Sequence, residues 1–150
     1  MSRDSSDLSF DQITDHLYVG GRLSGGDWHI LAALGVTVNI NLQLERQDHF
    51  SGSAPEVHLW VPTADWFGPG LDALRIVVPF IGAMIRQGRL VYVHCNAGMG
   101  RAPTAAAAYL VTTGMSVERA LALLREKRPA TYLNHIQLQQ LEDFAASLNR

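Results

Sequence analysis

Residues Val91 to Thr104 read Val-Tyr-Val-His-Cys-Asn-Ala-Gly-Met-Gly-Arg-Ala-Pro-Thr. The apolar start predicts a strand, and the alanine-rich run that follows the glycines predicts a helix beginning near Arg101. The single cysteine of the chain, Cys95, lies in the turn between them. Unpaired backbone N–H groups and the positive end of the helix dipole meet at such a turn, which favours a bound anion and a reactive thiolate. The stretch therefore predicts a nucleophile inside a phosphate-binding loop.

Arg101 follows Cys95 after five intervening residues. Its planar guanidinium group presents a fork of donors that matches two oxygens of a phosphoryl group, and lysine offers only a point charge. Gly98 and Gly100 allow unusual backbone angles or a close approach to the ligand. We expect the phosphate to be held by the backbone of Asn96, Ala97, Gly98, Met99, Gly100 and Arg101 and by the Arg101 side chain.

The His-Cys pair, five residues and an arginine resemble the signature loop of the cysteine-dependent, protein tyrosine phosphatase-like phosphatases, and the Asn-Ala-Gly-Met-Gly filling resembles the dual-specificity branch. The following Ala102-Pro103 departs from the Arg-Ser or Arg-Thr usual there and is similar to the loop of plant glucan phosphatases. Further along, Arg128-Pro129, Asn134 and Gln140-Leu141 are similar to a stretch that follows the signature loop in this branch. The resemblance implies a phosphatase of this family, with specific motifs in the last third of the chain.

Length and composition fit one soluble globular domain. The chain has 150 residues, of which 47% are hydrophobic and 17% charged, and its formal net charge is -2. This charge argues against a general nucleic-acid or membrane-surface binder. One cysteine excludes an internal disulfide and suits a reducing compartment, so we expect a cytoplasmic protein. Residues 1–9 are predicted to be a disordered tail, and residues 10–150 a single catalytic domain of the dual-specificity-phosphatase type.

Strands and helices alternate first, and then helices follow alone. This order predicts an α/β fold with a central, mostly parallel, twisted sheet flanked by helices and with the thiol loop between a central strand and a helix. Pro79 is expected to kink or split a helix over residues 71–87. The expected strands are 10–13, 17–20, 36–42, 57–61 and 90–94, and the expected helices are 27–34, 71–87, 101–113, 117–127 and one capped by Asn134, with Leu138, Leu141, Phe144 and Leu148 facing inward.

The segment from Gln43 to Pro55 is polar and contains Ser-Gly-Ser, so it predicts a long surface loop. Long loops in compact domains are often functional, and this one is a candidate wall of the site. An ordinary surface excursion is an equally good interpretation of the same composition.

Cys95 is the predicted nucleophile, and the departing alkoxide needs a proton from a carboxylic acid. Asp65 is the candidate acid because it follows a strand and lies in a loop rich in glycine and proline; it also precedes the thiol by about the interval that the family shows. Asp72 is the competitor, but it lies at a predicted helix start, where aspartate commonly serves as a cap.

His94 and Asn134 are predicted to position loops, with the His94 ring bonded to the loop backbone; a general-base role for His94 is the alternative. The resemblance implies a hydroxyl at position 102 that eases expulsion of the thiolate, and Ala102 has none. Thr104 is a candidate substitute, unless it is only a threonine on the surface of the helix.

Trp66 and Phe67 follow the candidate acid directly. Their rings either contact the substrate, as a stack on a sugar or beside a phosphotyrosine, or anchor the loop to the core. Trp28, Trp60 and Tyr132 are expected to be packing residues. The histidines show no metal-ligand spacing, so neither a metal nor another cofactor is implied.

The sequence therefore predicts a phosphomonoester hydrolase that works through a phosphocysteine intermediate. A phosphoprotein carrying phosphotyrosine, phosphoserine or phosphothreonine is the expected substrate, and a phosphorylated glucan or other carbohydrate is the alternative. The signature loop lacks the lysines usual in relatives that act on inositol phospholipids. A second alternative is a catalytically weak phosphate-binding module. We expect no nucleic-acid or membrane partner and a monomer.

Overall fold

The computed structural model describes residues 7–149. Within them lies a five-stranded sheet in the order β1-β2-β5-β3-β4, in which β1 runs antiparallel to β2 and the other neighbours are parallel. The prediction of a mostly parallel sheet flanked by helices is confirmed. The strands are β1 (Phe10–Gln12), β2 (Leu17–Gly20), β3 (Val36–Gln43), β4 (Val57–Thr63) and β5 (Leu90–His94).

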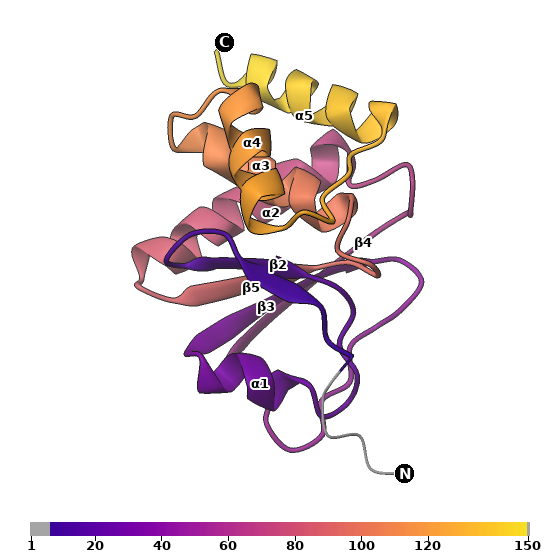
Figure 1. Ribbon diagram of the computed structural model, residues 1–150, viewed down its shortest axis with the longest axis vertical. Coiled ribbons are helices and arrows are strands. Elements are labelled where there is room, and N and C mark those ends of the chain that lie inside the picture. Colours follow the sequence, from indigo (N-terminus) through magenta and orange to yellow (C-terminus); the bar gives the residue numbers. More distant parts are fainter. Residues whose placement is uncertain (1–6, 150) are drawn as a thin grey trace.

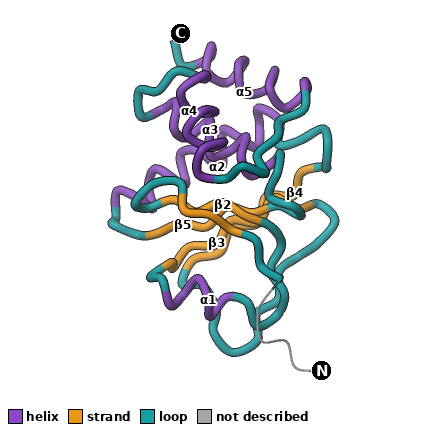
Figure 2. The backbone as a smooth tube through the Cα atoms, viewed as in Figure 1, coloured by secondary structure: helices purple, strands orange, loops and turns teal. Residues whose placement is uncertain are grey.

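The helices cover the two faces of the sheet unequally. One face carries only the short α1, and the four longer helices are stacked on the other face (Figure 1; Figure 2 shows the same division by type of element). The helices are α1 (Trp28–Ala33), α2 (Gly70–Arg86), α3 (Arg101–Thr112), α4 (Val117–Lys127) and α5 (His135–Ser147). Among the helices of residues 7–149, none is both long and apolar enough to cross a bilayer.

The central strand β5 and the helix α3 form the axis of the core. β5 has both faces covered, which matches its unbroken run of apolar residues. Residues 105–108 of α3 are four alanines with no exposed surface, and their small side chains let this helix lie close to its neighbours. A helix packed this tightly fixes the place of its first residue, Arg101, at the carboxyl end of β5.

The second helix was predicted to be kinked or split at Pro79, and the split does not occur. Gly70–Arg86 is one helix that is not split at Pro79. Pro79 lies on the exposed face of α2, so the backbone carbonyl that loses its donor there faces water.

The two ends of the described chain also differ from their predictions. Leu148, predicted to face inward, lies beyond the end of α5 and is 46% exposed.

The predicted disordered tail covered residues 1–9, of which residues 1–6 lie outside the described part. Ser9 is held in place at the inner end of that segment. Its carbonyl accepts a hydrogen bond from the Gly21 N–H at 2.8 Å, and its hydroxyl accepts one from Arg128 at 3.1 Å. The ordered structure therefore begins before Phe10, because Ser9 has partners in two distant parts of the sequence.

Candidate active site

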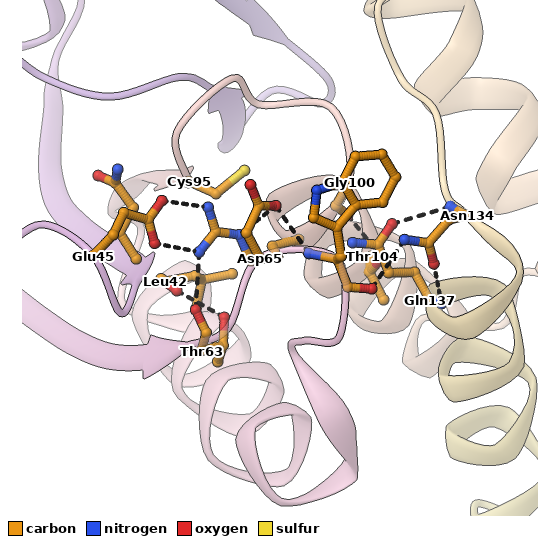
Figure 3. A network of polar contacts seen from close by, with 12 residues as sticks. Leu42, Glu45, Thr63, Asp65, Cys95, Gly100, Thr104, Asn134 and Gln137 are labelled. Carbon is orange, nitrogen blue, oxygen red and sulfur yellow. Dashed lines mark hydrogen bonds and ion pairs between the residues drawn. The ribbon is translucent and has the colours of Figure 1, made fainter.

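Cys95 lies directly after β5 at the base of a pocket of about 200 Å³. Its side chain is buried, and the thiol is not part of a disulfide. Figure 3 shows Cys95, Glu45 and Asp65 gathered around one guanidinium group. The pocket is lined by Asp65, Trp66, Cys95, Ala97, Met99, Gly100, Arg101, Tyr132, Asn134 and Gln137.

The loop from Cys95 to Arg101, here called the signature loop, has a protein donor for every carbonyl from residue 95 to residue 100. The donors are His94 Nδ1 to Cys95 O (3.2 Å), the Arg22 N–H to Asn96 O (2.8 Å), Arg128 Nη2 to Ala97 O (3.0 Å), Arg128 Nε to Gly98 O (2.7 Å), the Tyr132 N–H to Met99 O (2.7 Å), and the Thr104 N–H and hydroxyl to Gly100 O (2.9 and 2.7 Å).

This arrangement fixes the direction of the loop's N–H groups. In a trans peptide the carbonyl points away from the N–H of the next residue, and the cis bond described in residues 7–149 lies elsewhere, at Gly68-Pro69. Carbonyls bonded outward therefore turn the N–H groups of residues 96–101 inward. Within residues 7–149, none of these N–H groups donates to another protein group. Six unpaired donors at a helix N-terminus form a strong anion-binding site.

Two glycines make the tight curvature of this loop possible. Gly98 has a φ of +68°, and a Cβ placed there would lie 2.4 Å from the carbonyl carbon of Gly20. A Cβ on Gly100 would lie 2.6 Å from the side-chain oxygen of Gln137. At Gly98 the positive φ and the β2 backbone both require glycine. At Gly100 the close neighbour is the end of the Gln137 side chain, which a larger residue would displace.

Arg101 is 1% exposed, and its guanidinium group is held by Glu45 and Thr63. Its Nη1 and Nη2 donate to the two Glu45 carboxylate oxygens at 2.8 and 2.7 Å, and Nη1 also donates to Thr63 O at 2.9 Å. Arg101 Nε has no hydrogen-bond partner in the described residues and lies 3.6 Å from Asp65 Oδ1. Two N–H donors of the buried group, that of Nε and the second one of Nη2, therefore have no hydrogen-bond partner within residues 7–149 and are left for a ligand beside Cys95.

The contact between Glu45 and Arg101 shifts the pKa of both groups. The hydrogen bond from Arg101 lowers the pKa of Glu45 to about 2, against the opposing effect of burial. Burial lowers the pKa of Arg101, but the hydrogen bond and charge of Glu45 and the neighbouring Cys95 and Asp65 raise it further, so its net shift is upward. Both groups are consequently charged across the physiological range.

Behind the nucleophile, His94 is fully buried and hydrogen-bonded at both ring nitrogens. Nδ1 contacts Cys95 O at 3.2 Å, and Nε2 contacts Asp48 Oδ2 at 2.6 Å. Burial raises the pKa of Asp48, but the hydrogen bond and charge of His94 and the hydrogen bond from Asn39 outweigh this, so the pKa of Asp48 lies below its usual value. Because neither nitrogen of His94 is left for a substrate, the geometry favours a positioning role over the general-base alternative.

The loop between β3 and β4, residues 44–56, is the source of both acidic partners. Glu45 reaches Arg101, and Asp48 reaches His94. Two buried asparagines of β3 hold the loop in place, because Asn39 donates to Asp48 at 2.8 Å and Asn41 donates to the Arg46 carbonyl at 2.9 Å. Of the two interpretations left open by the sequence, the structure therefore favours a loop that forms part of the site.

The candidate acid lies across the pocket from the signature loop. Asp65 accepts a hydrogen bond from the Trp66 N–H at 3.0 Å, and its side chain is 59% exposed. Asp72, the competitor, lies in the first turn of α2 with a fully exposed side chain and lines a different hollow. The structure thus brings Asp65, and not Asp72, to the pocket of Cys95.

The segment of residues 64–69, here called the acid loop, is exposed at Asp65, Trp66 and Phe67 and is hydrogen-bonded to side chains of α5 and its cap. Asn134 caps α5 by accepting the Gln137 N–H, and its amide donates to Trp66 O at 2.9 Å. Trp66 and Phe67 are 64% and 66% exposed, so neither ring anchors the loop to the core. Trp66 lines the pocket, and Phe67 lines the neighbouring hollow instead.

Two further residues near the site differ from expectation. Tyr132, expected to pack, is 62% exposed and lines the pocket. The Thr104 hydroxyl donates to Gly100 O at 2.7 Å, so its proton is committed to the loop backbone and does not replace the hydroxyl missing at Ala102.

Sequence reasoning also missed Glu45, Asp48, Arg128 and Gln137. Arg128 had one signal, its place in the stretch that resembles the family downstream of the loop. Glu45 and Asp48 had only the length and polarity of their loop. Within residues 7–149, no three histidine, cysteine, aspartate or glutamate side chains are grouped as metal ligands would be.

Comparisons with known proteins agree with this geometry. A phosphatidylglycerophosphate phosphatase, PTPMT2 of Arabidopsis thaliana, is 33% identical over 143 residues, which are 91% of this chain and 62% of the relative. Laforin of Mus musculus is 32% identical over 96 residues, 62% of this chain and 29% of laforin. This chain thus spans less than two thirds of the length of either relative.

A mouse putative dual specificity phosphatase, solved in complex with zinc tungstate, has the same fold with a TM-score of 0.85, at 22% identity, over 99% of this chain and 94% of that one. The model of the family "Dual specificity phosphatase, catalytic domain" matches residues 17–147, which span β2 to the end of α5 and include the signature loop, the acid loop and the loop that carries Glu45. The chain therefore belongs to the dual specificity phosphatase catalytic-domain family.

Proposed function

We propose that this protein hydrolyses phosphomonoesters through a phosphocysteine intermediate, with phosphotyrosine and phosphoserine or phosphothreonine of proteins as its substrates. The observation that carries the proposal is the position of Cys95 at the base of a pocket toward which the N–H groups of residues 96–101 are turned. A cradle of donors around a thiol suits a phosphoryl group whose phosphorus is the point of attack.

The chemistry follows from three side chains. The Cys95 thiolate attacks phosphorus in line, the bond to the ester oxygen breaks, and Asp65 gives its proton to that oxygen. Arg101 and the loop N–H groups hold the equatorial oxygens as charge shifts. In the second step Asp65, now a carboxylate, removes a proton from water as the water attacks the phosphocysteine. Inorganic phosphate leaves, and the thiolate and the protonated acid are restored.

Family membership supports a protein substrate, and the rim of the pocket supports an alternative. Trp66 and Tyr132 line the pocket with most of their surfaces exposed, and Met99 beside them is 44% exposed. Large exposed aromatic faces can stack on a sugar ring as well as on a phosphotyrosine ring. A phosphorylated glucan is therefore the second candidate, in line with the Ala102-Pro103 continuation.

The first experiment measures phosphate release from p-nitrophenyl phosphate in the presence of a chelator, with and without vanadate. We expect release that vanadate inhibits and that Cys95→Ser abolishes. Tungstate binding, measured by calorimetry, should survive in Cys95→Ser because the loop N–H groups and Arg101 remain. Wild-type protein that binds tungstate but releases no phosphate would indicate the phosphate-binding module instead.

The second experiment compares kcat/KM on phosphotyrosyl and phosphothreonyl peptides, phosphorylated amylopectin and phosphatidylglycerophosphate in mixed micelles. The last is included because the Arabidopsis relative is described as a phosphatase of that lipid. The proposal expects the peptides to be the best substrates. A kcat/KM more than about ten-fold higher on the glucan, equal to about 1.4 kcal/mol in transition-state binding, would show that the substrate is a phosphorylated carbohydrate and not a phosphoprotein.

A further inference from the structure

Arg128 donates hydrogen bonds to two carbonyls of the signature loop and has no role in the catalytic steps described above. It follows α4, is 1% exposed, and directs its guanidinium group at the loop from outside the pocket. Nε donates to Gly98 O at 2.7 Å and Nη2 donates to Ala97 O at 3.0 Å. One side chain therefore binds two consecutive carbonyls of the phosphate-binding loop.

These two carbonyls belong to the peptide units on either side of Gly98. Glycine has no Cβ, so reversing either peptide unit there meets less steric resistance than at the other loop residues. A reversed unit would turn its N–H away from the pocket and place a carbonyl oxygen, which repels an anion, inside it. Arg128 opposes both reversals, because each would break a charge-assisted hydrogen bond within a buried environment.

The outer side of the same guanidinium group is tied to the start of the chain. Nη1 donates to Asp11 Oδ2 at 2.9 Å, and Nη2 also donates to the Ser9 hydroxyl at 3.1 Å. Asp11 supplies the opposite charge that a buried arginine requires, and it fixes the plane of the fork. The first strand of the sheet is thereby connected to the phosphate-binding loop through a single side chain.

We propose that Arg128, oriented by Asp11, is a positioning residue that keeps the N–H groups of Gly98 and Met99 directed into the phosphate pocket. The proposal rests on the proposed function in taking the pocket's ligand to be a phosphoryl group. Arg128 touches neither the substrate nor the reacting atoms. Its effect is on how many loop donors the phosphate finds in place, in the ground state and the transition state alike.

The test compares tungstate binding and p-nitrophenyl phosphate turnover in Arg128→Lys, Arg128→Met and the control Arg89→Met. Arg89 forms a surface pair with Glu56 at 2.7 Å outside the site, so its variant removes an equal charge. Lysine keeps the charge at position 128 but lacks the fork that serves two carbonyls. We expect both Arg128 variants to bind tungstate about ten- to a hundred-fold more weakly, the loss expected for two disordered anion donors. Arg89→Met should bind as wild type does.

A purely electrostatic role makes a different prediction. Arg128→Lys would then bind tungstate as tightly as wild type, and that result would overturn the proposal. If the Arg128 variants do not fold, Asp11→Asn replaces them, because it leaves the guanidinium group and its Ser9 contact in place and removes the charged partner of Nη1. Tungstate binding about three-fold weaker in that variant supports the proposal, because the lost charged hydrogen bond orients Arg128 and does not contact the loop itself. Wild-type affinity overturns the proposal.

Tungstate binding needs no turnover, so the two proposals fail separately. Wild-type protein that binds tungstate but does not hydrolyse phosphomonoesters would reject the proposed function and leave the role of Arg128 to be decided by the same affinities. Active wild-type protein with unchanged tungstate affinity in Arg128→Lys and Arg128→Met would reject Arg128 alone.

Discussion

Residues 95–101 and residues 64–69 form two walls of one pocket, and they are held in contrasting ways. Each carbonyl of residues 95–100 in the signature loop has a protein hydrogen-bond donor, and Cys95 and Arg101 are almost completely buried. The acid loop is exposed over Asp65, Trp66 and Phe67, and its hydrogen bonds to the rest of residues 7–149 are two side-chain contacts, from Asn134 and Gln140, to its carbonyls.

The two loops are suited to two different functions, phosphate binding and proton transfer. Holding phosphate in a fixed orientation needs donors that do not reorganise, which a fully bonded loop provides. Delivering a proton to a leaving group needs an acid that approaches only when a substrate is bound, and an exposed loop with few tethers can move. The molecule therefore combines a preorganised binding wall with a lightly tethered catalytic one, and substitutions on the two walls should have separable effects.

The largest difference between the effect on turnover and the effect on anion binding is expected from Asp65→Asn. Asparagine cannot donate a proton as an acid, and general acid catalysis contributes about a hundred-fold or more to reactions of this kind. We expect kcat on alkyl phosphates to fall by about that factor, and kcat on p-nitrophenyl phosphate to fall much less, because its leaving group departs without protonation. Tungstate affinity should be retained, since the signature loop is intact.

Steady-state kinetics on the two substrate classes test this assignment, with Asp72→Asn as the matched control, since Asp72 lines the hollow next to the acid loop. Loss of the same size on both classes would mean that Asp65 serves binding and not proton transfer. An effect of Asp72→Asn confined to alkyl phosphates would transfer the role of the acid to that residue.

A smaller effect is expected from Asn134→Ala. The Asn134 amide tethers the acid loop at Trp66 O, and its side-chain oxygen caps α5. Its removal should lower kcat on alkyl phosphates about three- to ten-fold, the size expected when one hydrogen bond that places the acid is lost, with little change in tungstate binding. Gln139→Ala is the control, because Gln139 is exposed on the same helix and, in the described part of the chain, its side chain hydrogen-bonds to Asp143 alone. Equal losses of tungstate affinity and turnover would show that the tether supports the whole pocket.

The sequence predicted one wall of this pocket far better than the other parts of the site. The signature loop is local: its nucleophile, its glycines and Arg101 lie within a few residues, so their chemistry can be read from spacing. The acid loop needed a choice between Asp65 and Asp72, and the strand that ends at Thr63 decided its position. Helix and strand boundaries followed from apolar periodicity. That α2 is not split at Pro79 could not be decided, because the exposed placement of Pro79 is set by tertiary packing.

The supporting residues could not be predicted, for a physical reason. Glu45, Asp48 and Arg128 act through contacts with residues 56, 46 and about 30 positions away along the chain. Such contacts depend on strand order and on the path of the loop between β3 and β4, which composition does not determine. Tyr132 was assigned to the core because most tyrosines bury part of their ring, and only the position of the segment before α5 brings it to the pocket.

The smallest expected effect is the contribution of the Glu45–Arg101 pair to the free energy of unfolding. It is tested best by measuring that free energy at several pH values. The pKa of Glu45 is lowered to about 2 by its hydrogen bond with Arg101, so the folded state favours the carboxylate. A carboxyl group with a depressed pKa stabilises the fold above its unfolded pKa, near 4.5, and loses that contribution as the pH falls towards 2. Because the Glu45 side chain is 43% exposed, solvent screening reduces the contribution to about 0.5–1 kcal/mol.

Glu45→Gln should therefore lower the free energy of unfolding by about that amount at pH 7. Urea titrations at pH 7, 5, 4 and 3 should show the gap between wild type and variant constant above about pH 5 and narrowing below it, since wild type loses its carboxylate there and the variant has none to lose. Glu56→Gln, at the exposed pair with Arg89, should show a smaller gap at every pH because its partner is not buried. A gap for Glu45→Gln that stays unchanged down to pH 3 would mean that the carboxylate charge does not stabilise the fold. The support of Arg101 would then come from Thr63 and from packing, and the signature-loop wall would be rigid without help from the loop between β3 and β4.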